Sequence, residues 1–80
     1  MTSFDARLRM MGTSGLPLGV EIDLTAERMT VKAGESEVAD WALEEIKVSS
    51  LPDGFHIVAE GEEVVVNVTD NKRFASEIGL

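Results

Sequence analysis

The chain has 80 residues, of which 44% are hydrophobic, and it carries a net charge of −8 at neutral pH. This length allows one small domain, in which a deep enzyme cleft would compete with the core for the same side chains. There is no cysteine, which excludes a disulfide framework and a thiolate metal site. No apolar run approaches the roughly 20 residues of a membrane span, and the first residues lack the apolar segment of a secretory signal. We therefore expect a single soluble domain over residues 1–80, located in the cytoplasm.

The acidic charge is unevenly distributed. Residues 35–63 contain nine acids and a single base, Lys47, whereas the six acids and six bases elsewhere cancel. A field of this sign repels nucleic acids and anionic lipid surfaces, so we expect neither as a partner. It either keeps the protein in solution or attracts a basic protein.

Residues 4–11 fit two kinds of element. As a strand, they place alternate apolar side chains, beginning with Phe4, on one face. As a helix, they form an apolar stripe of Phe4, Leu8 and Met11. We favour the strand, because without it the sheet would have an even smaller core.

Short strands separated by turns are predicted for most of the remaining chain, after a Gly- and Pro-containing loop at 12–17. The strand segments are residues 18–24, 28–32, 37–41, 44–50 and 55–69. The last is a hairpin around Gly61, and a turn precedes it in which Pro52 presets φ and Gly54 supplies a positive φ. Residues 40–47 also fit a helical turn, but we favour two strands because the apolar residues that follow alternate.

The C-terminal segment changes to a helical period. Phe74 and Ile78 are four residues apart and would share one helix face. Asp70 is a suitable N-cap and Gly79 a suitable stop, which predicts a helix over 70–80.

About seven antiparallel strands followed by one helix resemble the pleckstrin-homology-like fold, in particular its small bacterial members. The segment VADWALEEIKV at 38–48 looks like a crossing between strands in those proteins, and residues 54–80 resemble their closing hairpin and helix. The resemblance implies a mainly β domain of two near-orthogonal sheets closed by the helix at 70–80. It also implies a non-catalytic protein- or peptide-interaction or scaffold module without a cofactor.

Lipid-binding members of that superfamily carry Lys and Arg around the loop between their first two strands. The corresponding loop at 12–17 contains neither, so phosphoinositide binding does not carry over. We expect a protein or peptide partner, bound along a sheet edge or in the groove between an edge strand and the terminal helix. The alternative is an acidic inhibitor or antagonist that binds a basic protein through residues 35–63. A further alternative is a homodimer, in which the short helix packs against a second copy of the chain.

No set of residues indicates catalysis or metal binding. His56 has no nucleophile or orienting group beside it in the sequence, so we expect it to face solvent and the protein not to be an enzyme. The carboxylates Glu21 and Asp23 lack the turning loop that calcium requires. Arg7 and Arg9 share a strand face, and we expect them to pair with those two carboxylates rather than to bind an anion.

Trp41 is expected in or near the core rather than as an exposed anchor. The candidate partner contacts are the charged residues Arg7, Arg9, Glu35, Glu37, Glu44, Glu45, Glu62 and Glu63.

Overall fold

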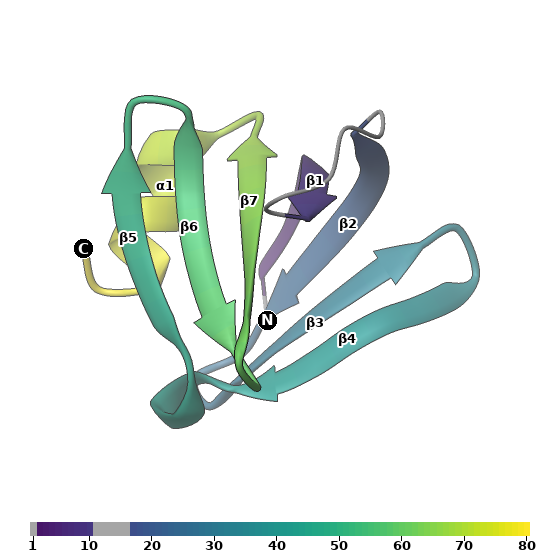
Figure 1. Cartoon of the computed structure of the whole chain (residues 1–80), viewed down its shortest axis with the longest axis horizontal. Coiled ribbons are helices and arrows are strands. Elements are labelled where there is room, and N and C mark those ends of the chain that lie inside the picture. Colours follow the sequence, from purple (N-terminus) through teal and green to yellow (C-terminus); the bar gives the residue numbers. More distant parts are fainter. Residues whose placement is uncertain (1, 11–16) are drawn as a thin grey trace.

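The structure, a computed structural model, describes residues 2–10 and 17–80 (Figure 1). Its elements are β1 (Thr2–Met10), β2 (Leu18–Leu24), β3 (Arg28–Ala33), β4 (Ser36–Ala42), a 3-10 turn η1 (Leu43–Glu45), β5 (Lys47–Leu51), β6 (Gly54–Ala59), β7 (Glu62–Val68) and α1 (Asn71–Glu77). The prediction of a mainly β chain with seven antiparallel strands and a C-terminal helix is confirmed. No helix among the described residues is long and apolar enough to cross a membrane.

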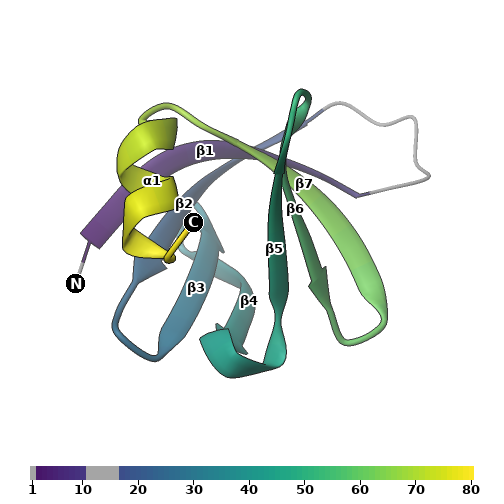
Figure 2. The same cartoon turned by 90° about the vertical axis from the view of Figure 1, so that its left-hand side faces the viewer.

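All seven strands belong to one sheet, in the order β4-β3-β2-β1-β7-β6-β5. Strand β1 joins the two halves, because it pairs with β2 from Thr2 to Leu8 and with β7 from Ala6 to Met10. Figure 2 shows the sheet curling into a half-barrel, with α1 at one end. The expectation of two separate near-orthogonal sheets is not confirmed, since the shared strand makes the sheet continuous.

The N-terminal ambiguity is resolved in favour of the strand. Phe4, Ala6 and Leu8 on β1 are buried, while Asp5 and Arg7 between them are exposed. Met11 and the greater part of the predicted loop, residues 12–16, lie outside the described residues.

The two strands predicted over residues 37–50 are only partly right. Strand β4 ends at Ala42, η1 follows, and β5 begins at Lys47. The Leu43 N–H donates to the Glu27 carbonyl at 2.8 Å, which holds the turn against the connection between β2 and β3. The helical-turn alternative therefore applies to Leu43–Glu45, where the chain passes from one edge of the sheet to the other.

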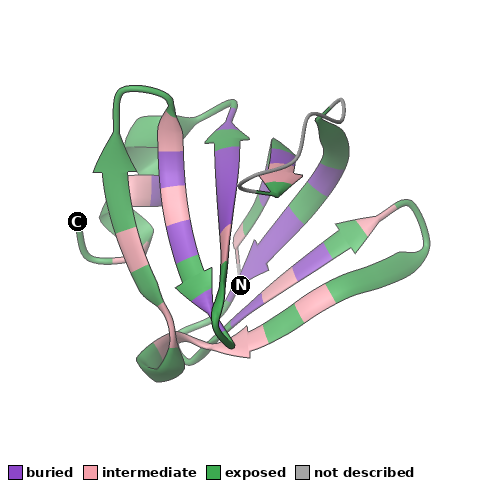
Figure 3. Ribbon diagram, in the orientation of Figure 1, coloured by how far each residue is buried: buried purple, intermediate pink, exposed green. Residues whose placement is uncertain are grey.

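The core fills the inner face of the half-barrel and is completed by the helix (Figure 3). Phe74 is fully buried, and its ring meets Phe4 edge-on at 5.3 Å and Phe55 at 4.8 Å between centroids. Trp41 is half-buried and packs against this core, as expected. Helix α1 is thus held to the sheet through one large aromatic anchor.

Both predicted ends of the helix are confirmed. The Asp70 carboxylate accepts a hydrogen bond from the Arg73 backbone N–H at 3.3 Å. Gly79 has a φ of 85°, and the N–H groups of Gly79 and Leu80 donate to the carbonyls of Ser76 and Ala75. These contacts close the last turn and stop the helix.

Candidate functional site

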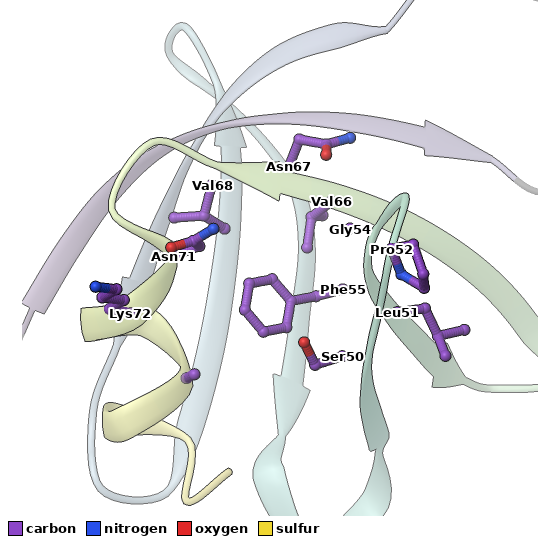
Figure 4. A pocket seen from close by; sticks show the side chains of 11 residues that line it. Ser50, Leu51, Pro52, Gly54, Phe55, Val66, Asn67, Val68, Asn71 and Lys72 are labelled. Atoms are coloured by element: carbon purple, nitrogen blue, oxygen red, sulfur yellow. The ribbon is translucent and has the colours of Figure 1, made fainter.

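A groove of about 330 Å³ lies between the edge strand β5 and helix α1. Figure 4 shows the Phe55 ring between the helix on one side and Ser50 on the other. The lining residues come from β5 and its turn, from β6 and β7, and from α1: Ser50, Leu51, Pro52, Gly54, Phe55, Val66, Asn67, Val68, Asn71, Lys72 and Ala75.

The groove exists because the short helix covers only part of the sheet's inner face. Phe74 draws α1 against Phe4 and Phe55. Strand β5 is the last strand of the sheet, so within the described part of the chain its outer edge has no neighbouring strand. Backbone N–H and C=O groups on such an edge are available to another extended chain. Leu51 remains 49% exposed at the end of this strand.

The turn between β5 and β6 fixes one wall of the groove. Gly54 has a φ of 134°, as the sequence predicted for this turn. A Cβ at this position would lie 2.8 Å from the Val66 carbonyl oxygen and 2.9 Å from the Asn67 side-chain oxygen. The turn therefore sits directly on β7, and only glycine permits that approach.

His56 holds the same turn from the outer face of the sheet. Its Nδ1 lies 2.7 Å from Glu63 Oε2, and its Nε2 lies 2.7 Å from Asp53 Oδ1. Its side chain is 11% exposed, so the expectation that it faces solvent is wrong. The turn folds Asp53 back over the strand, and the β6–β7 register brings Glu63 within reach. The spacing of three residues between Asp53 and His56 across a turn was the available signal for this contact.

The two carboxylates favour the protonated form of His56. Hydrogen bonding to Glu63, and next to Asp53, raises the pKa of His56 above its usual range. The hydrogen bond to His56 in turn lowers the pKa of Asp53. Because both ring nitrogens engage carboxylates, neither is free to take a proton from a substrate. Among the described residues, no group of three or more His, Asp or Glu could hold a metal ion.

Stability is expected to fall as the pH rises above neutrality. The contribution of a raised His56 pKa is complete below the unfolded value of about 6.5 and is lost as the pH rises through the folded pKa. The lowered pKa of Asp53 acts oppositely, with a contribution lost only at strongly acidic pH.

NMR titration of the His56 ring should give a midpoint above about 6.5. Thermal unfolding between about pH 6 and about pH 9 should show a decrease that a His56→Gln variant lacks. A midpoint at or below the usual value would contradict this account.

The structure does not gather the predicted contact residues into one site. Glu35 lies in the β3–β4 turn, Glu37 on β4, and Glu44 and Glu45 in η1. Glu62 and Glu63 begin β7, and of these only Glu63 binds His56.

The expected pairing of Arg7 and Arg9 with acids on the next strand is wrong. The register places Arg7 opposite Gly19, and it places Ser3, not an arginine, opposite Asp23. Asp23 accepts a hydrogen bond from the Ser3 hydroxyl at 2.5 Å and lies 3.5 Å from the Lys32 ammonium. Within the described residues neither arginine forms an ion pair.

The comparisons with known proteins assign no family. No protein-family model matches the chain, and no curated protein matches it significantly. A function can therefore be inferred only from the geometry of the groove between β5 and α1.

Proposed function

We propose that the chain is a non-catalytic peptide-interaction module of pleckstrin-homology-like architecture, in which the two halves of the curled sheet take the place of two near-orthogonal sheets. Its partner is an extended protein segment bound between β5 and α1. The observation that carries this proposal is a groove with the edge strand β5 along one wall, a strand whose outer edge pairs with no other strand among the described residues. The partner would add a strand beside β5 and so gain backbone hydrogen bonds along its length.

The chemistry of the groove supports an apolar anchor on that partner. Its base is the Phe55 ring, and Leu51 and Ala75 stand on opposite walls. A peptide side chain inserted there would leave water for an apolar surface. Lys72 is exposed at the helix side of the groove and would favour an acidic residue beside the anchor.

A peptide selection tests this function. The 80-residue chain is used as bait for displayed random peptides, and a selected peptide is then titrated by NMR. We expect new hydrogen-exchange protection of amides in Lys47–Leu51 and shifts in α1. Protection confined to any other strand would contradict the proposal.

A matched pair of surface variants localises the binding. Leu51→Glu changes an exposed side chain on the groove wall, and Val58→Glu changes a similarly exposed side chain on β6 that does not line the groove. We expect the first to weaken the selected peptide roughly tenfold or more, since it places a charge in an apolar contact, and the second to have little effect. Equal effects of the two variants would place the peptide elsewhere.

A further inference from the structure

A second groove lies between the edge strand β4 and the β6–β7 hairpin. It has a volume of about 160 Å³ and shares no lining residue with the groove beside α1. Its lining residues are Val38, Ala39, Asp40, Trp41, Ile57, Ala59, Glu60, Glu62 and Val64.

A bulge in β4 shapes the apolar wall of this groove. Val31 pairs with Ala39 but Lys32 pairs with Glu37, so Val38 is an extra residue without a partner on β3. A bulge turns a side chain away from the regular alternation, and Val38 is accordingly 47% exposed. The half-buried Trp41 lies on the same strand and lines the same groove.

The β6–β7 hairpin forms the opposite wall, which combines buried apolar residues with exposed acidic ones. Ala59 and Val64 are buried and line the groove. Glu60 and Glu62 flank the hairpin glycine, are exposed, and form no ion pair with any residue that the structure describes. On the β4 side, Asp40 is already paired with Arg28 at 2.8 Å. Both groove carboxylates that have no ion-pair partner among the described residues, Glu60 and Glu62, therefore lie on the hairpin side.

Most residues of both walls belong to the acidic segment 35–63, which contains nine acids and a single base. A negative field of this kind attracts cationic ligands and repels anionic ones. The apolar surface between Val38, Trp41 and the hairpin adds a place for one uncharged side chain, which charge alone does not provide. Specificity then arises from the combination of the two features.

We propose that this second groove docks a basic protein segment in which one apolar side chain is flanked by Lys or Arg. The apolar side chain enters between β4 and the hairpin, and the flanking cations pair with Glu60 and Glu62. This site is separate from the groove beside α1, so either can exist without the other.

Trp41 is the only tryptophan of the chain and reports directly on this groove. The probe is an end-blocked Lys-Lys-Leu-Lys-Lys peptide, titrated against the full chain at low salt. We expect a saturable change in Trp41 fluorescence and NMR shifts in β4 and the β6–β7 hairpin. Lys-Lys-Gly-Lys-Lys should bind several-fold more weakly because it lacks the anchor, and Glu-Glu-Leu-Glu-Glu should not bind.

Two double variants with the same change in net charge separate docking from general attraction. Glu60→Lys with Glu62→Lys reverses the groove carboxylates, whereas Glu44→Lys with Glu45→Lys reverses two acids in η1 that do not line the groove. We expect the first pair to weaken the Leu-containing peptide roughly tenfold and the second by less than about twofold.

Three results would overturn the proposal: equal weakening by both double variants, equal binding of the Leu and Gly peptides, or shifts centred on β5 and α1. The last result would assign the basic peptide to the groove beside α1. None of these outcomes alters the test of that groove with Leu51→Glu and Val58→Glu.

Discussion

The Phe74→Ala variant is expected to lose about 3–5 kcal/mol of unfolding free energy, the usual cost of removing a fully buried aromatic side chain. The side chain is 0% exposed and contacts the rings of Phe4 and Phe55. A domain of this size has a total stability of only about 5–10 kcal/mol, so a large share of it would be lost. Because α1 forms one wall of the groove beside β5, the groove should be lost together with the helix contact.

Urea unfolding followed by circular dichroism measures this effect. Phe74→Leu keeps most of the buried volume and should cost markedly less than alanine. Arg73→Ala, at the neighbouring exposed position, should change stability by no more than about 0.5 kcal/mol. A loss below about 1 kcal/mol in Phe74→Ala would show that the helix is not anchored by this ring.

The Gly54→Ala variant is expected to lose about 2–3 kcal/mol for two separate reasons. Its φ of 134° is strained for any residue with a side chain. The added Cβ would also approach the Val66 carbonyl oxygen to 2.8 Å, which forces the turn off β7. Since Pro52 and Gly54 line the groove beside α1, the variant should also shift the resonances of Asn71 and Lys72.

Gly19→Ala is the matched control for that variant. Gly19 is in β2, and nothing lies within 4 Å of a Cβ built on it. We expect a change of less than about 1 kcal/mol, because alanine loses less backbone entropy on folding. Similar losses in both variants would mean that the contact with β7 is not the cause.

Regular alternation made most of the strands predictable from sequence. Leu18–Leu24 alternates without interruption and forms β2 with the predicted bounds. The helix was predictable from the spacing of Phe74 and Ile78 together with the capping Asp70. The crossing at Leu43–Glu45 was harder to predict, because a 3-10 turn of three residues is too short to show a repeating pattern of apolar residues.

The site residues depended on register, which local patterns do not specify. Arg7 shares a strand face with Arg9, but the pairing of β1 with β2 places Gly19 opposite it. The environment of His56 likewise follows from the way the turn at Asp53 returns and from the β6–β7 pairing. Sequence reasoning expected a partner along a sheet edge or in a groove between an edge strand and the helix, but none of its candidate contact residues lines the groove beside α1.

The pairing of β1 with β7 has a consequence for how the chain folds. Every other strand pair joins consecutive strands, so β1 to β4 and β5 to β7 are two local meanders. The contact between them brings Ala6 opposite Val68 and closes nearly the entire chain into a loop. Contacts of such long sequence separation are slow to form. Docking of the two meanders through β1 and β7 is therefore expected to limit the folding rate. During synthesis, the second edge of β1 stays unpaired until β7, the last strand, has been made.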